Sequence, residues 1–230
     1  MGEQYPGFDN VEYATSINLP LVHDTRLRLD AAGIDYAIFS GSHAALLGGH
    51  RVTPDVDFWT DHEKWEELIA AFSSPDDVIT DRRATWREGQ PYDGVLVTRG
   101  NQGDVGIMAG TIIFADGVTY PSPFTELVRA NRQYTTLGPI VGWFANPADT
   151  LLFKAISQRG RDQGKHDIDD ITAITSKVSI DRSYLLLRMD ECRARERTLP
   201  LFLRMGVLTE ADVTAYDAQR DIILHHYLTR

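Results

Sequence analysis

The chain has 230 residues, of which 43% are hydrophobic and 24% are charged, and its formal net charge is −10. This composition is typical of a globular protein, and the acidic balance argues against non-specific binding to nucleic acid. No apolar run approaches the roughly 18–20 residues that a membrane-spanning helix needs, so we expect no membrane partner. The acidic first residues do not resemble a secretory signal and the single cysteine, Cys192, can form no internal disulfide. We therefore expect a cytoplasmic protein.

The hydrophobic pattern predicts helices and strands that alternate in the first part of the chain. Helices are predicted over residues 20–32 and 43–47, and strands over residues 34–39 and 56–59. A third helix is predicted to start after Thr60 and to end near residues 73–75. Gly41-Ser42 is predicted to form the turn after the first strand, with His43 on the surface of the short helix that follows. Thr60 and Glu63 have the spacing of a helix-capping box.

The rest of the chain divides into a strand-rich stretch and a helical stretch. Strands are predicted over residues 77–80, 94–98, 104–108, 111–114 and 140–144, with a short helix over residues 124–130. Asn146-Pro147 is a strong helix start, and helices are predicted over residues 147–158, 167–176, 180–197, 199–205 and 209–227. We therefore expect an α+β fold: a mixed sheet with flanking helices over residues 1–145, and a helical C-terminal part over residues 146–230 packed on it.

Two carboxylates, Asp55 and Asp57, stand at the start of the second predicted strand. Side chains two residues apart on a strand point to the same face, and a carboxylate pair on one face suits a Mg²⁺ ion. Such a pair is often merely solvated, but the apolar residues around it indicate a buried strand. Asp104 is our candidate for a third carboxylate, with a turn-capping role as the alternative; Asp93 and Asp116 are weaker candidates because each precedes a glycine.

A second group of residues has the chemistry to bind phosphate. The backbone N–H groups and the hydroxyl of Gly41-Ser42 favour anions. Four cations gather over residues 154–165 against the single acid Asp162, in a chain that is otherwise acidic, and they are Lys154, Arg159, Arg161 and Lys165. Lys154 lies in an apolar helical stretch, where it either extends to the surface or reaches a polar site. The cluster suits a triphosphate.

These features together resemble the DNA polymerase β-like nucleotidyltransferases, whose pattern is an apolar strand, Gly-Gly or Gly-Ser, a spacer and then Asp-apolar-Asp. The Arg51-Val-Thr53 segment also matches the superfamily. Residues 147–170 narrow the resemblance to the AbiEii and MenT-type toxin nucleotidyltransferases. The resemblance implies that catalytic and metal-binding roles fall on Asp55, Asp57 and Asp104, with Lys154 also catalytic. It further implies that the nucleotide is bound by Gly41, Ser42, Arg51, Thr53, Arg159, Lys165, Asp167 and Asp170, while Asp169 is solvated.

The resemblance implies transfer of a nucleoside monophosphate from an NTP to an acceptor hydroxyl, with Mg²⁺, or alternatively Mn²⁺, as cofactor. The acceptor that it suggests is a tRNA 3′ end, attacked by a toxin that a cognate antitoxin protein restrains. Arginines of the helical part either contact a phosphate backbone or form a solvated face, the latter being favoured, and they are Arg188, Arg193, Arg195, Arg197 and Arg204. Two alternatives stay open: transfer to a small molecule such as an aminoglycoside or lincosamide, and an inactive binding module of the same fold.

Overall fold

A computed structural model describes residues 17–49, 55–73, 79–85, 93–99, 104–163 and 165–229. Its helices are α2 (Leu19–Ala31), α3 (Ser40–Leu46), α4 (Trp65–Ala71), α5 (Glu126–Asn131), α6 (Pro147–Ser157), α7 (Asp167–Thr175), α8 (Arg182–Glu191), α9 (Arg195–Arg204) and α10 (Glu210–Leu228), with short 3-10 turns η1 (His62–Lys64) and η2 (Arg161–Gln163). Its strands are β1 (Tyr36–Phe39), β2 (Val56–Thr60), β3 (Ile79–Thr85), β4 (Asp93–Arg99), β5 (Asp104–Ala109), β6 (Ile112–Ala115), β7 (Val118–Pro121), β8 (Gln133–Leu137) and β9 (Ile140–Phe144). None of the helices in these ranges is both long enough and apolar enough to cross a membrane.

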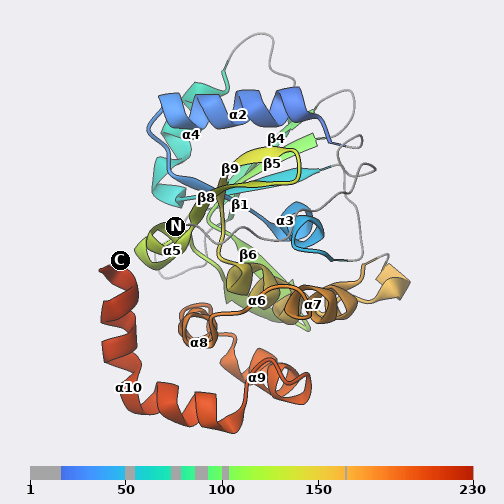
Figure 1. Ribbon diagram of the computed structural model, residues 1–230. Helices are drawn as coiled ribbons and strands as arrows, with labels where there is room; N and C mark the ends of the chain where they lie inside the picture. The colour runs from blue at the N-terminus through green and yellow to red at the C-terminus, as the bar shows by residue number, and fades with distance from the viewer. Residues whose placement is uncertain are drawn as a thin grey trace.

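Seven of the described strands form one mixed sheet in the order β3-β4-β5-β2-β1-β9-β8. Strands β2 and β5 pair in parallel, as do β1 and β9, while the other neighbours are antiparallel. Strands β6 and β7 form a separate antiparallel hairpin. The expected mixed sheet with flanking helices and a helical C-terminal part is therefore confirmed, and Figure 1 shows α2 and α4 on one side of the sheet and α3, α6 and α7 on the other.

The local sequence explains where the principal helices begin. The side chain of Asn146 accepts a hydrogen bond from the N–H of Ala148 at 3.0 Å, and Pro147 occupies the first helical position of α6. Helix α10 has a full capping box between Thr209 and Asp212. These caps fix the register of both helices, and in α6 that register places Lys154 on the side facing α7.

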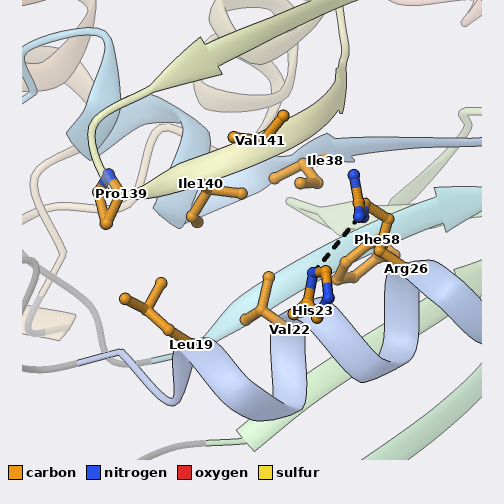
Figure 2. Close-up of a pocket in the computed structure, with 9 residues that line it drawn as sticks. All are labelled: Leu19, Val22, His23, Arg26, Ile38, Phe58, Pro139, Ile140 and Val141. Atoms are coloured by element: carbon orange, nitrogen blue, oxygen red, sulfur yellow. Dashed lines mark hydrogen bonds between the residues drawn. The ribbon is translucent and has the colours of Figure 1, made fainter.

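Alternation along the two central strands gives the sheet faces of different character. On β1 and β2, Ile38 and Phe58 face α2 and line an apolar pocket of about 340 Å³ between that helix and the sheet. Figure 2 shows the pocket, with His23 and Arg26 of α2 at its polar edge. The intervening side chains, including Asp57, point to the opposite face because the side chains of a strand alternate.

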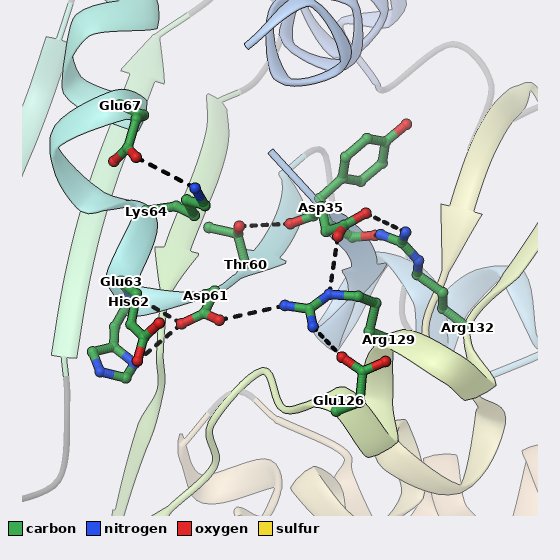
Figure 3. A network of polar contacts seen from close by, with 11 residues as sticks. Asp35, Thr60, Asp61, His62, Glu63, Lys64, Glu67, Glu126, Arg129 and Arg132 are labelled. Carbon is green, nitrogen blue, oxygen red and sulfur yellow. Dashed lines mark hydrogen bonds and ion pairs between the residues drawn. The ribbon is translucent and has the colours of Figure 1, made fainter. Parts of the chain in front are cut away.

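A network of ion pairs and hydrogen bonds connects the residue before β1 and the residue after β2 to α5 and to Arg132 directly after it (Figure 3). Arg129 contacts Asp35 through Nε at 2.9 Å and Asp61 through Nη2 at 3.4 Å. Arg132 also pairs with Asp35, and the Thr60 hydroxyl donates to the Asp35 carbonyl at 2.6 Å. The Asp61 side chain accepts from the N–H of Glu63, so Asp61 caps η1 and the expected cap at Thr60 is wrong.

Three further expectations differ from the structure. Gly41-Ser42 is not a turn, because α3 begins at Ser40 directly after β1. The helix expected over residues 180–197 is two helices, since Arg193 adopts a left-handed φ of +54° and the N–H of Ala194 bonds back to Met189. Strands β7 and β8 were not expected from the sequence. Their exposed, mixed residues give no clear alternation.

Candidate active site

The candidate site begins where β1 passes directly into α3. Ser40 has a φ of +65°, a left-handed conformation that is costly for a residue with a side chain. This conformation turns the chain sharply, and Ser40 and Gly41 line a cavity of about 270 Å³. Ser42, by contrast, is buried, and its hydroxyl donates to the carbonyl of Phe39 at 3.1 Å. The hydroxyl that borders the cavity is therefore that of Ser40, not the expected Ser42.

The carboxylates of β2 lie on the same side of the sheet as this junction, and Asp55 and Asp57 both line the cavity. Asp57 is opposite Gly106 of β5, where an added Cβ would lie 2.7 Å from Asp57 Oδ1. Glycine is required at this position because the Asp57 carboxylate occupies the space that a side chain would fill. The Gly in the sequence between Val105 and Ile107 thus makes room for a site residue on the neighbouring strand.

The surroundings of Asp57 disfavour its charged form. The pKa of Asp57 is raised to about 6, chiefly by burial and to a lesser extent by the neighbouring Asp55, although a hydrogen bond from Ser40 and the charge of Lys165 act in the opposite direction. A carboxylate pair held in this way gains stability from any cation placed between the two groups.

Opposite the carboxylates, α6 contributes Lys154, whose side chain is only 10% exposed. Its Nζ lies 3.0 Å from Asp167 and 2.7 Å from Asp170, both at the start of α7 and both buried. Gly49 makes the approach of α7 to α3 feasible, since a Cβ there would lie 2.9 Å from Asp170 Oδ1. Lys154 is therefore held by two carboxylates at the cavity wall and does not extend to the surface.

Arg159 completes this arrangement after the end of α6. Its Nε and its backbone N–H both donate to Asp167 Oδ2 at 2.9 Å. Burial by itself would raise the pKa of Asp167, but the hydrogen bonds from Arg159 and the charge of Lys154 lower it below its usual value. Asp167 is thus a fixed anion that positions two cations.

The cavity brings together most of the residues that the sequence singled out. Its described lining is Ser40, Gly41, Asp55, Asp57, Met108, Lys154, Arg159, Lys165, His166 and Asp170. Asp167 lies behind this wall and holds it in place. Asp169 pairs with Arg161 at 2.9 Å on the outside, and Arg51 and Thr53 lie outside the described residues.

Asp104 is beside the site and does not form part of the described lining. Its backbone N–H donates to Asp55 Oδ1 at 3.4 Å, which places the start of β5 next to the start of β2. Among the residues that the structure describes, no set of three or more His, Cys, Asp or Glu side chains is arranged to hold a metal ion. A third metal-binding carboxylate at Asp104 remains a prediction.

Sequence reasoning missed Ser40, Met108 and His166 in the lining, and it placed His43 wrongly. His43 is 1% exposed, and its Nδ1 lies 2.8 Å from the Thr150 hydroxyl of α6. Burial lowers the pKa of His43 to about 3, so the ring is neutral. This contact joins α3 to α6, two helices that contribute residues to the cavity lining. The small residues before His43 and the apolar run after it were a signal for its burial.

The arginines of the helical part form neither an open basic surface nor a uniformly solvated face. Arg188 is fully buried, with its Nε 2.6 Å from Asp149. Arg195 pairs with Asp217 and Arg197 with Asp116, each at 2.7 Å. These three guanidinium groups are engaged within the chain. Arg193 and Arg204 are exposed.

Comparison with known proteins gives no match to a family model and none to a curated protein sequence. Solved structures with a similar arrangement of elements are nucleotidyltransferases. A Thermotoga maritima protein of that description has 17% identity and a TM-score of 0.43, over 62% of this chain and 82% of its own. The lincosamide adenylyltransferase LnuA has 15% identity and a TM-score of 0.44, over 70% and 99%. The antibiotic-resistance factor ANT(2'')-Ia has 11% identity and a TM-score of 0.47, over 79% and 94%.

Proposed function

We propose that the chain is a metal-dependent nucleotidyltransferase that moves a nucleoside monophosphate from an NTP to an acceptor hydroxyl and releases pyrophosphate. The observation that carries the proposal is the cavity itself. Two carboxylates, Asp57 on β2 and Asp55 directly before that strand, face Lys154, Arg159 and Lys165 within a volume of about 270 Å³. A carboxylate side suits a divalent cation, and a cationic side suits the phosphates that share that cation.

The donor set fits Mg²⁺, with Mn²⁺ as an alternative. Asp55 and Asp57 offer hard oxygen ligands on one face, and Mg²⁺ in nucleotide sites commonly takes one or two carboxylates and fills its other positions with water and phosphate oxygens. When bound there, the cation would neutralise charge on the phosphates and on the leaving pyrophosphate. Asp104 is the proposed additional carboxylate at the same end of the strands.

The protein's own groups then have distinct tasks. Lys165 and Arg159 bind phosphate oxygens, and Arg159 is oriented for this by Asp167. Lys154 lies between Asp167 and Asp170, so its ammonium group is fixed at the wall before substrate arrives. A fixed charge costs no reorganisation when negative charge develops on the transferred phosphoryl group. Ser40 and Gly41 complete the wall on the α3 side.

For the acceptor, we propose a tRNA 3′ end, and for the biological role a toxin whose partner is an antitoxin protein. The support is the Lys154, Arg159, Lys165, Asp167 and Asp170 pattern, which resembles the AbiEii and MenT-type group. In the structure these residues lie together.

A small-molecule acceptor is the second candidate, and one observation favours it. Arg188, Arg195 and Arg197 are engaged in ion pairs inside the chain, which reduces the number of cations available to a long phosphate backbone. An inactive binding module of the same fold is the alternative that the isothermal titration below addresses.

The test is incubation of the protein and Mg²⁺ with each α-³²P-labelled NTP, with total tRNA in one arm and an aminoglycoside and lincosamide panel in the other. Label on tRNA supports the toxin proposal, and label on an antibiotic supports the second candidate. Isothermal titration with an α,β-methylene NTP separates the remaining cases. Binding without transfer indicates an inactive module or another acceptor, and no binding contradicts the proposed function.

A further inference from the structure

A second cavity, of about 440 Å³, adjoins the candidate active site. The two cavities share Ser40, Met108 and Arg159 in their linings. The second one extends from this shared border between the β6 strand and the C-terminal half of α6, where Phe114 and Phe153 lie. A ligand that fills the first cavity can therefore continue into the second.

Two aromatic side chains, Phe114 and Phe153, line the second cavity from opposite elements. Phe153 is held edge-on by Phe39 at 5.1 Å and by Trp59 at 5.5 Å between ring centroids, so its orientation is fixed by packing. On β6, Phe114 lines the same cavity and is 73% exposed. Ser157 and Gln163 add hydrogen-bonding groups at the rim. The lining as a whole exposes more polar than apolar surface, so the two rings lie among several hydrogen-bonding groups, a combination that suits a planar heterocycle with polar edges.

The position of the second cavity relative to Asp57 bears on what kind of ligand it can hold. On β5, Asp104, Gly106 and Met108 share one face, with Gly106 opposite Asp57. Successive residues of one face are roughly 6.6 Å apart along a strand. The second cavity therefore starts one such step beyond Asp57, on the side away from Asp104. A nucleoside attached to a phosphate at Asp57 spans that distance.

The cationic wall argues against an acceptor at this position. Arg159 borders both cavities, so the second cavity lies on the side where the pyrophosphate would leave. In-line transfer requires the acceptor oxygen to approach from the side opposite the leaving group. Lys154 and Lys165 line the first cavity and are not among the described lining of the second, so the triphosphate itself belongs to the first.

We propose that the second cavity is the nucleoside subsite of the NTP, with the base stacked on Phe114 and packed against Phe153. This proposal rests on the proposed function. The exposed ring of Phe114 loses its contact with water when the base covers it, which favours binding of any planar base. The rim groups of Ser157 and Gln163 then distinguish one base from another.

The experiment compares two probes in the presence of Mg²⁺ by isothermal titration: α,β-methylene analogues of the four NTPs, and inorganic tripolyphosphate, which has the phosphates without the nucleoside. In the wild-type protein, at least one analogue should bind more tightly than tripolyphosphate. Phe114→Ala should raise the Kd of that analogue about tenfold, in line with the loss of one stacking contact, and leave the Kd of tripolyphosphate unchanged.

Two further variants serve as controls. Phe114→Trp retains a stacking surface and should restore the analogue affinity. Val118→Ala changes an exposed apolar residue of the same hairpin that is 50% exposed and is not among the described lining of the cavity, so it should have no effect on either probe. Because Phe114 and Val118 are both exposed, neither change should impair folding.

The possible results distinguish a failure of the nucleoside-subsite proposal from a failure of the proposed nucleotidyltransferase function. Equal affinities of the wild-type protein for the analogues and tripolyphosphate, or an analogue affinity that Phe114→Ala leaves unchanged, would overturn the nucleoside subsite while nucleotide transfer stands. A Phe114→Ala variant that raises only the KM for the acceptor would also overturn it. Failure of the wild-type protein to bind either probe would contradict the proposed function itself.

Discussion

The two faces of the central sheet carry cavities of similar size and opposite chemistry. The cavity on the Asp57 face, of about 270 Å³, is lined mostly by charged and polar groups. The pocket on the α2 face, of about 340 Å³, is lined mostly by apolar side chains (Figure 2). The same strand β2 supplies Asp57 to one and Phe58 to the other. A shift of one residue in register would exchange them, so the pairing of β2 with β5 is a condition for the site.

The two faces of the sheet also differ in what they contribute to the stability of the fold and to the chemistry of the site. Charges on the Asp57 face are placed where they cost folding energy, as the raised pKa of Asp57 indicates. The α2 face contributes apolar burial, which stabilises the fold. We therefore expect most substitutions on the Asp57 face to lower activity more than stability, and those on the α2 face to lower stability more than activity.

Asp57→Ala should reduce nucleotide transfer by a factor of about 1,000 or more while leaving the thermal midpoint unchanged or higher. The reason is that the change removes a proposed metal ligand and also the repulsion between two carboxylates. Initial rates with the labelled NTP and a thermal melt measure the two quantities. Asp162→Asn, at an exposed carboxylate that is not among the described lining of the cavity, is the matched control. Full activity of Asp57→Ala at wild-type stability would remove Asp57 from the site.

Lys154→Ala should destabilise the protein by about 3–5 kcal/mol, because it leaves Asp167 and Asp170 buried without their shared cation. This is the one place where a substitution on the Asp57 face should affect stability strongly. Urea denaturation gives the change in the free energy of unfolding. Arg161→Ala breaks the exposed pair with Asp169 and should have a much smaller effect on stability, because solvent screens that pair. Equal effects of the two variants would show that burial of the Lys154 pair is energetically unimportant.

Ile140→Ala tests the α2 face. Ile140 is 2% exposed and lines the apolar pocket, so its truncation should cost about 2–4 kcal/mol of unfolding free energy. Well below the melting temperature, kcat/KM should match that of the wild-type protein. Val141→Ala, at a neighbouring residue that is 45% exposed, should cost much less. A loss of transfer activity in folded Ile140→Ala would indicate that the two faces are coupled.

His43 gives a prediction for pH. Its folded-state pKa of about 3 lies below the usual value of 6.5, so the unfolded chain takes up a proton at pH values where the folded chain does not. Stability should therefore fall as the pH drops below about 6.5, by at most about 1.4 kcal/mol per pH unit from this group. Urea denaturation at pH 7 and pH 5 measures the difference. His43→Gln retains a polar contact for Thr150 and should show a smaller difference. An equal pH response in both proteins would contradict the assignment.

The elements that sequence patterns located well are those set by local chemistry. The Asn146-Pro147 cap placed α6, and the two-residue spacing of Asp55 and Asp57 put them on one face. The patterns failed where a non-glycine residue takes a left-handed conformation, at Ser40 and at Arg193, because residue type alone gives no sign of it. They also failed for His43, whose burial depends on α6, more than a hundred residues away in the chain.

By itself, the sequence determined the alternation of helices and strands, the chemical types at the site and the segments that carry them. The tertiary structure decided that Ser40 replaces Ser42 at the cavity, that Lys154 is held by two buried carboxylates, and that a second cavity adjoins the first. The physical reason is the distance along the chain over which each kind of interaction acts. Caps and strand periodicity act within a few residues, whereas burial, ion pairing and cavity shape arise from segments that meet only after the chain has folded.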